Sequence, residues 1–262
     1  MASLPLQNKK VFITRAEKQS EDFIFQVLKY GGEPVALPLI AFKAATLTEE
    51  QQQLLHKAST YDWLIFTSAN GIDFFFEQLE SKNIEPDFSS NKIAVVGEKT
   101  HKALSKYGLT ATIMPREFVA EGLVYTFKEY DMKNQKVLYV KGNLSRGVIP
   151  EQVRLLGANV DELTAYETYC PTSSERLTEL LSTSIDVFTF TSPSTVQNFV
   201  RLLDGENWKK WIDSAVICCI GPITKAAAEN VGLNPKIVPT TYTIESLVHE
   251  IVMYYNHKEE VK

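Results

Sequence analysis

Two stretches of this sequence, 124 positions apart, carry the same residues at the same spacing. Asp62 and the run Phe66-Thr67-Ser68 recur as Asp186 and Phe190-Thr191-Ser192. A gapless window then repeats a further set, in which Gly97, Thr100, Ala103, Gly108, Leu109, Ile113 and Pro115 recur as Gly221, Thr224, Ala227, Gly232, Leu233, Ile237 and Pro239. So many matches in one register predict two copies of a single folding unit. Two unrelated segments that share their turn chemistry are the alternative.

Runs of strand-forming residues alternate with amphipathic stretches along the chain, which is typical of a parallel sheet covered by helices. Helices are expected at residues 21–30 and 244–255, for example, and Val27 and Leu28 should belong to the apolar face of the first. The expected strands are Val11–Thr14, Glu33–Leu37, Trp63–Thr67, Ile93–Val96, Thr112–Met114, Val137–Val140, Asn159–Leu163, Val187–Thr191, Ala215–Ile220 and Lys236–Val238.

Composition and charge exclude several classes of protein. The chain has 262 residues and a net charge of −5, which disfavours a nucleic-acid partner. It contains no apolar run of signal-peptide or membrane-span length, so we expect a cytoplasmic protein with no membrane contact. The adjacent Cys218 and Cys219 would point to opposite faces of a strand and are expected to be reduced core residues. The four histidines are scattered, so no metal site is expected.

Hydroxyls, glycines and basic residues are concentrated where the expected strands end. Ligands of parallel sheets bind beyond these ends, where the N–H groups of helix starts can hold carboxylate or phosphate. Each hydroxyl could instead serve only as a helix cap. The set favours a small molecule with many anionic groups, bound in a cleft between the two halves. The segments are Thr14-Arg15, Thr67 to Asn70, Gly97 to Thr100, Lys141 to Asn143, Ser145-Arg146, Thr191 to Ser194 and Gly221 to Thr224.

Familiar nucleotide and hydrolase motifs are missing from the sequence. No G-x-G-x-x-G follows the first strand and no G-x-x-x-x-G-K-[ST] occurs, so dinucleotide and P-loop nucleotide sites lack support. No G-x-S-x-G nucleophile elbow occurs either.

The motifs that are present, taken in order, give the chain a resemblance to the uroporphyrinogen-III synthase family over nearly its whole length. They are Val-Phe-Ile-Thr-Arg at 11–15, Gly-Gly-Glu-Pro-Val at 31–35 with Pro-Leu-Ile at 38–40, Phe-Thr-Ser-Ala-Asn at 66–70, Val-Gly with Thr at 96–100, Lys-Gly-Asn-Leu-Ser-Arg at 141–146, Ala-Tyr-Glu-Thr at 165–168, Phe-Thr-Ser-Pro-Ser at 190–194 and Ile-Gly-Pro-Ile-Thr at 220–224.

The resemblance implies two similar parallel-sheet α/β/α domains, flavodoxin-like or Rossmann-like, joined by a two-stranded hinge. The domains are then not the two halves of the sequence. Residues 1–38 and 169–262 would form the first domain and residues 39–168 the second, with hinge crossings near 38–42 and 164–170. Composition and periodicity alone would have placed a single boundary near residue 130.

The resemblance also implies the reaction. The linear tetrapyrrole hydroxymethylbilane would be cyclised to uroporphyrinogen III, with loss of water and inversion of the terminal pyrrole ring through a spiro intermediate, as a step of haem and sirohaem biosynthesis. No cofactor or metal is implied. Tyr166 is expected to be the catalytic proton donor, because a neutral phenol can donate a hydrogen bond to the departing oxygen. Expected substrate-binding residues are Thr14, Arg15, Thr67, Ser68, Asn70, Gly97, Thr100, Lys141, Gly142, Asn143, Arg146, Thr191, Ser192, Ser194, Gly221, Thr224 and Lys225.

Two other functions are compatible with paired α/β domains. One is a small-molecule binding protein that resembles a periplasmic receptor, and the other is a nucleotide-sugar transferase. The lack of an export signal disfavours the first, and the lack of a phosphate loop disfavours the second. We expect a monomer. A transient hand-over of substrate from the preceding pathway enzyme stays open.

Overall fold

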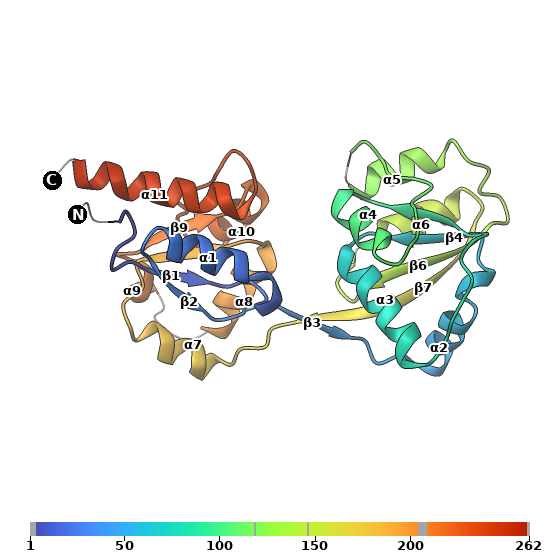
Figure 1. Cartoon of the computed structure of the whole chain (residues 1–262), viewed down its shortest axis with the longest axis horizontal. Coiled ribbons are helices and arrows are strands. Elements are labelled where there is room, and N and C mark those ends of the chain that lie inside the picture. The colour runs from blue at the N-terminus through green and yellow to red at the C-terminus, as the bar shows by residue number, and fades with distance from the viewer. Residues whose placement is uncertain (1–3, 118, 146, 204–208, 261–262) are drawn as a thin grey trace. The chain divides into compact units, whose positions relative to one another are not determined.

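A computed structural model describes residues 4–117, 119–145, 147–203 and 209–260. The chain divides into two compact units, of which unit 1 contains Met1–Ala41 and Tyr169–Lys262 and unit 2 contains Phe42–Thr168. Each unit is built around its own sheet, and each is described by itself (Figure 1).

Unit 1 contains a four-stranded parallel sheet in the order β2-β1-β8-β9. Successive strand residues point to opposite faces of the sheet and are apolar on both faces. Helices therefore cover both faces and form an apolar cluster with the strands on each. Phe12 and Phe188 pack toward α7, α8 and α10, whereas Val11 and Val187 pack toward α1 and α11. The elements are β1 (Lys10–Ile13), η1 (Glu17–Gln19), α1 (Glu21–Lys29), β2 (Glu33–Ala36), α7 (Ser174–Leu181), β8 (Val187–Phe190), α8 (Pro193–Leu202), α9 (Lys209–Ile212), β9 (Val216–Cys219), α10 (Pro222–Asn230) and α11 (Ile244–Glu260).

Unit 2 contains a five-stranded sheet in the order β3-β7-β6-β4-β5. Leu64 and Leu138 pack toward α2, α3 and α4, whereas Trp63 and Val137 pack toward α5 and α6. The pairs β4-β5, β4-β6 and β6-β7 are parallel. The elements are β3 (Ala41–Ala44), α2 (Glu49–His56), η2 (Ala58–Thr60), β4 (Trp63–Phe66), α3 (Ala69–Ser81), β5 (Lys92–Val95), α4 (Glu98–Ser105), α5 (Ala120–Phe127), β6 (Lys136–Gly142), α6 (Val148–Leu155) and β7 (Asn159–Tyr169).

The internal repeat is visible in the topology. The 124-residue offset relates β4 to β8 and β5 to β9. An offset of 126 residues, which aligns Val11 with Val137, relates β1 to β6 and β2 to β7. With these equivalences the order β2-β1-β8-β9 of unit 1 is the order β7-β6-β4-β5 of unit 2. The structure therefore confirms the predicted α/β class with parallel strands.

Three local expectations are wrong. The expected strands Thr112–Met114 and Lys236–Val238 are reduced to single bridges, at Ile113 and Ile237. A proline follows each bridge closely and has no N–H to continue a ladder. Leu28 does not join the core of α1, since 55% of it is exposed and only Phe23 and Val27 of that helix are buried.

The cysteine expectation is confirmed. Cys218 and Cys219 are unpaired and fully buried, and they pack into the clusters on opposite faces of the unit 1 sheet. Thr243 caps the last helix, since its Oγ1 accepts a hydrogen bond from the N–H of Ser246 at 3.2 Å. In the described part of the chain, no helix is both long enough and apolar enough to cross a membrane.

Candidate active site

Tyr166 lies near the end of β7 in an aromatic setting of unit 2. Its ring stacks on Phe74 of α3, with centroids 5.6 Å apart and ring planes at 20°. Phe42 of β3 meets the same ring edge-on, at 5.9 Å. The ring also lies against Gly142, which pairs with Tyr166 across the β6-β7 ladder. Aromatic neighbours on two sides shield part of the phenol ring from water, and the residue as a whole is partly buried.

The hydroxyl of Tyr166 has one partner, Ser68, among the hydrogen bonds of the described residues. Its Oη lies 3.1 Å from the Oγ of Ser68. The same Oγ accepts a hydrogen bond from the N–H of Gly71 at 3.0 Å, and Ser68 thereby caps α3. Ser68, at the carboxyl end of β4, therefore contacts both the first turn of α3 and Tyr166, the residue expected to be the proton donor.

The pKa of Tyr166 lies above its ordinary value of 10.0. Burial is the largest cause, because the phenolate loses more hydration than the phenol, and the nearby Tyr139 acts in the same direction. The hydrogen bond with Ser68 acts in the opposite direction and stabilises the phenolate. Tyr166 is therefore a protonated group with an available O–H at neutral pH.

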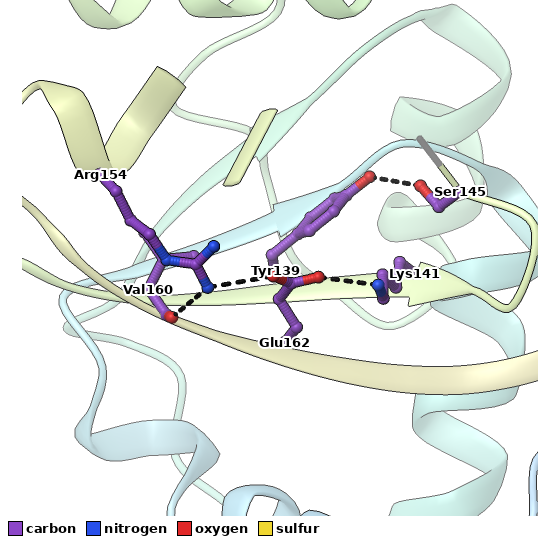
Figure 2. A network of polar contacts seen from close by, with 6 residues as sticks. All are labelled: Tyr139, Lys141, Ser145, Arg154, Val160 and Glu162. Atoms are coloured by element: carbon purple, nitrogen blue, oxygen red, sulfur yellow. Dashed lines mark hydrogen bonds and ion pairs between the residues drawn. The ribbon is translucent and has the colours of Figure 1, made fainter. Parts of the chain in front are cut away.

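Lys141 is held by an internal ion pair. Its Nζ lies 2.7 Å from Oε2 of Glu162, and Arg154 Nη2 donates to Oε1 of the same carboxylate at 3.0 Å (Figure 2). Arg154 also donates to the carbonyl of Val160 at 2.8 Å. Burial would raise the pKa of Glu162, but the hydrogen bonds from Lys141 and Arg154 outweigh it and lower that pKa. The expected carboxylate-binding lysine is thus already committed to a carboxylate of its own chain.

Two further residues of the β6 end are used within unit 2. Asn143 accepts from the N–H of Thr168 at 2.8 Å and donates to the carbonyl of Thr168 at 3.3 Å, which fixes its amide on the end of β7. Tyr139 Oη lies 2.6 Å from Oγ of Ser145 (Figure 2). Arg146 lies outside the described residues.

In unit 1 the expected residues occupy the same topological places. Thr14 is buried and donates to the carbonyl of Thr189 at 2.9 Å, so its hydroxyl belongs to the sheet. Arg15 is half-buried and donates to Gln19 at 3.3 Å, and burial lowers its pKa against the opposing effect of Asp22. No ion pair with a carboxylate is shown for Arg15 within the described residues.

Two helix starts with an extended glycine at the N-cap position lack a side-chain cap. Gly97 precedes α4 and Gly221 precedes α10, and neither start receives a side-chain hydrogen bond. Both glycines have the same extended backbone, with φ of −167° and −173°. Uncapped first-turn N–H groups with a positive dipole end are suited to an anion. The buried Thr100 and Thr224 lie in the first turns of these helices, and Lys225 pairs with Glu229 at 3.6 Å.

The structure brings together four of the expected residues, all in unit 2. Ser68 and Gly142 contact the side chain of Tyr166, and the N–H of Asn143 donates to the carbonyl of Tyr166 at 3.1 Å. Ser192 and Ser194 of unit 1 contact each other, with their Oγ atoms 3.1 Å apart. Three further expected residues are half-buried beside helix starts, namely Thr67 and Asn70 at α3 and Thr191 at α8.

Sequence reasoning missed Phe42 and Phe74 as neighbours of Tyr166 and Glu162 as the partner of Lys141. The only available signal was strand alternation, which places Glu162 on the same face of its strand as Val160.

A pocket of about 640 Å³ surrounds the other end of α3 and is lined by Leu79, Phe88 and Tyr107 among others. None of the expected site residues lines it. The described part of the chain also contains no cluster of three or more His, Cys, Asp or Glu side chains suited to a metal.

Comparisons with known proteins assign the chain to a family. The model of the family described as "Uroporphyrinogen-III synthase HemD" matches residues 8–249. The uroporphyrinogen-III synthase of Chlorobaculum parvum is 30% identical over 88% of this chain and 93% of its own length, and that of Synechococcus elongatus is 29% identical over 95% and 96%.

Solved structures show the same fold. A mutant uroporphyrinogen III synthase of Thermus thermophilus aligns with a TM-score of 0.66 at 16% identity, over 97% of this chain and all of that one. The corresponding protein of Helicobacter pylori aligns with a TM-score of 0.63 at 15% identity, over 95% of this chain and 100% of its own. Because the family model spans almost the whole chain, this protein belongs to the uroporphyrinogen-III synthase family, the enzymes that make uroporphyrinogen III in tetrapyrrole biosynthesis.

Proposed function

We propose that the protein cyclises hydroxymethylbilane to uroporphyrinogen III with Tyr166 as the proton donor. The observation that supports this choice is the setting of Tyr166, a neutral phenol with a raised pKa, packed between aromatic side chains and hydrogen-bonded to Ser68. Such a group can donate a hydrogen bond to the terminal hydroxyl of the substrate as that hydroxyl leaves as water.

The proton balance of this step is closed. Loss of hydroxide with the proton of Tyr166 gives one water and an electron-poor methylene pyrrole. The substituted carbon of the last pyrrole ring then attacks this methylene to form the spiro intermediate. The bond from that ring carbon to its original methylene bridge then breaks, and the freed methylene bonds to the unsubstituted α-carbon of the same ring. This second carbon loses its proton, which restores the phenol. Catalysis of this kind depends on enforced geometry more than on a strong acid, since the substrate closes to the wrong isomer in solution.

Binding of the substrate carboxylates is proposed to rely on helix-start N–H groups in both units. The uncapped starts at Gly97 and Gly221 and the half-buried Arg15 support this. Lys141 and Asn143 are weaker candidates, because each is already engaged with a group of β7. Single substitutions at the binding residues should therefore weaken binding modestly.

We also propose that the two compact units are domains joined by a hinge, and that the protein is a cytoplasmic monomer. The chain passes between the units at Ala41–Phe42 and at Thr168–Tyr169, which supports hinge segments near 38–42 and 164–170. Small-angle scattering with and without product, together with sedimentation, would test the hinge and the monomer. Receipt of substrate from the preceding pathway enzyme would be tested by adding that enzyme to the sedimentation experiment.

The decisive experiment is an isomer assay. Purified protein is incubated with hydroxymethylbilane, with and without chelator, and the oxidised products are separated by chromatography. The inverted isomer should dominate in both cases. Tyr166→Phe should lower kcat at least about tenfold, whereas Tyr125→Phe, at an exposed tyrosine of α5, should not change it. Near-normal activity of Tyr166→Phe would refute the assignment of the proton donor.

A further inference from the structure

The ring of Tyr166 can lie where it does only because its neighbour on β6 has no side chain. A Cβ built on Gly142 would lie 2.5 Å from Cζ of Tyr166 and 2.8 Å from its Cε2 and Oη. Real Cβ atoms do not approach other atoms so closely, so any larger residue would push the phenol end of the ring away. The ladder shifts register between Lys141 and Gly142, and this irregularity sets Gly142 directly opposite Tyr166.

Gly142 leaves room for the ring of Tyr166, and Ser68 holds its hydroxyl through the contact between Oγ and Oη. Its Oγ is itself held by the N–H of Gly71, which comes from the first turn of α3. The same helix supplies Phe74, which stacks on the ring. The helix α3 therefore both contacts the face of the ring, through Phe74, and holds the partner of its Oη, through the N–H of Gly71.

The other copy of the repeat lacks this arrangement, although it keeps the serine. Ser192 caps α8 as Ser68 caps α3, with the N–H of Thr195 3.3 Å from its Oγ. Its second partner is Ser194, however, not a tyrosine. The 126-residue offset that relates β1 to β6 places Ala16 at the position of Gly142 and Ile40 at the position of Tyr166. At these two positions, the copy in unit 2 has glycine and tyrosine, and the copy in unit 1 has alanine and isoleucine.

We propose that Gly142 and Ser68 are positioning residues for Tyr166, in which Gly142 seats the ring and Ser68 holds the hydroxyl. This role differs from the substrate contact that the sequence alone suggests for both. It rests on the proposed function of Tyr166, and it places the proton-donating apparatus in unit 2 alone. The uncapped helix start at Gly221 leaves unit 1 a role in binding.

The test is a pair of double-mutant cycles. Ser68→Ala should lower kcat about three- to tenfold and Gly142→Ala about tenfold, each with KM changed less than about twofold, because the substitutions act on the proton donor and not on binding. In the Tyr166→Phe background neither substitution should lower kcat further. Ser68→Thr keeps the hydroxyl and should retain most of the activity.

Loss of the helix cap is controlled separately. Thr48 caps α2 of the same unit through the N–H of Gln51 and has no part in the site. Thr48→Ala should therefore lower Tm to a similar degree as Ser68→Ala while kcat stays unchanged.

The position of the Tyr166 ring is measured independently of activity by NMR, in protein labelled with ¹³C at tyrosine Cζ. The Tyr166 signal is assigned by its absence from Tyr166→Phe. This signal should shift in both Ser68→Ala and Gly142→Ala.

Two outcomes would overturn the proposal. One is that either substitution lowers kcat equally in the wild-type and Tyr166→Phe backgrounds, which would show independent action. The other is an unchanged Tyr166 signal in both variants. Normal activity of Tyr166→Phe is a different result. It would refute the assignment of Tyr166 as the proton donor, and the NMR signal would still decide whether Gly142 and Ser68 position its ring.

Discussion

Glu162 illustrates, at the residue scale, how a half-buried carboxylate becomes stabilising. Its side chain is 27% exposed and that of Lys141 is 23% exposed, so both charges lose part of their hydration. The carboxylate recovers this loss because each of its oxygens meets a cation. Removal of the charge would leave Lys141 and Arg154 without their shared partner.

We therefore expect Glu162→Gln to lower the free energy of unfolding by about 1–2 kcal/mol at pH 7. The pKa of Glu162 is lowered by folding, so its stabilisation is present above the ordinary value of 4.5 and is lost as pH falls through the folded value. Urea unfolding at several pH values should show the difference shrinking in acid. Glu129→Gln, at an exposed loop position, is the control. A difference that does not depend on pH would contradict this account.

The three cysteines should differ in reactivity toward a thiol reagent. Burial raises the pKa of Cys219 to about 12 and that of Cys218 well above its usual range, so both thiols are protonated at neutral pH. Cys170 is only partly buried. Titration of the native protein with a chromogenic disulfide should label one thiol rapidly, and addition of denaturant should release two more. Rapid labelling of all three before unfolding would show that the β9 region opens readily.

At the scale of elements, the repeat extends to the glycines that end equivalent helices. Gly108 follows α4 with φ of +72° and Gly232 follows α10 with φ of +84°, both in the left-handed region. Nothing lies within 4 Å of a Cβ built on Gly108, so a substitution there measures backbone strain alone. Asparagine tolerates this conformation, and this chain uses it at Asn83 with φ of 52°.

Gly108→Ala should lower the free energy of unfolding by about 1–2 kcal/mol, and Gly108→Asn by less, because only the φ penalty differs between them. Gly232→Ala should cost a similar amount, since its surroundings are nearly as open. Chemical unfolding of the three variants beside the wild type gives the comparison. An equal loss for alanine and asparagine at residue 108 would mean that the cost is not one of backbone conformation.

The sequence predicted the central strands well because their residues are apolar on both faces of the sheet, as in the fully buried β4. It did not predict β3, whose sequence Ala-Phe-Lys-Ala is short and carries one strand-forming residue. It also ended β7 at Leu163, six residues before the strand ends at Tyr169. Of the later residues only Ala165 is buried and the burial alternates weakly, so periodicity could not extend the strand.

For the candidate site, the sequence analysis proposed Tyr166, Ser68 and Gly142 as site residues but did not predict that they are in contact. That contact depends on the register shift between β6 and β7, and pairing registers across a crossover are not encoded in local pattern. The partner of Lys141 was missed for the same reason, because Glu162 reaches it from the neighbouring strand. Turn residues thus indicated where chemistry could occur, and long-range pairing determined which side chains meet.

At the scale of the whole molecule, the duplicated sequence and the folded units divide the chain differently. Unit 2 is continuous, from Phe42 to Thr168, and contains its own five-stranded sheet with an apolar cluster on each face. Unit 1 needs two distant segments, because β1 pairs with β8. A cut near residue 130, at the midpoint suggested by the repeat, would leave β4 without β6 and would remove Leu138 and Val140 from their cluster.

A fragment of residues 42–168 should therefore fold alone, whereas a fragment of residues 1–130 should not, although the two have nearly the same length. The first keeps every strand of one sheet, and the second carries incomplete parts of two sheets with unpaired edges. Dispersed amide signals and a cooperative thermal transition are expected for 42–168, and neither for 1–130. The Tyr166 signal of the folded fragment should also match that of the full chain, because Ser68, Phe74 and Gly142 all lie within it. An unfolded 42–168 would show that its stability depends on the rest of the chain, and the division into two independent units would then be wrong.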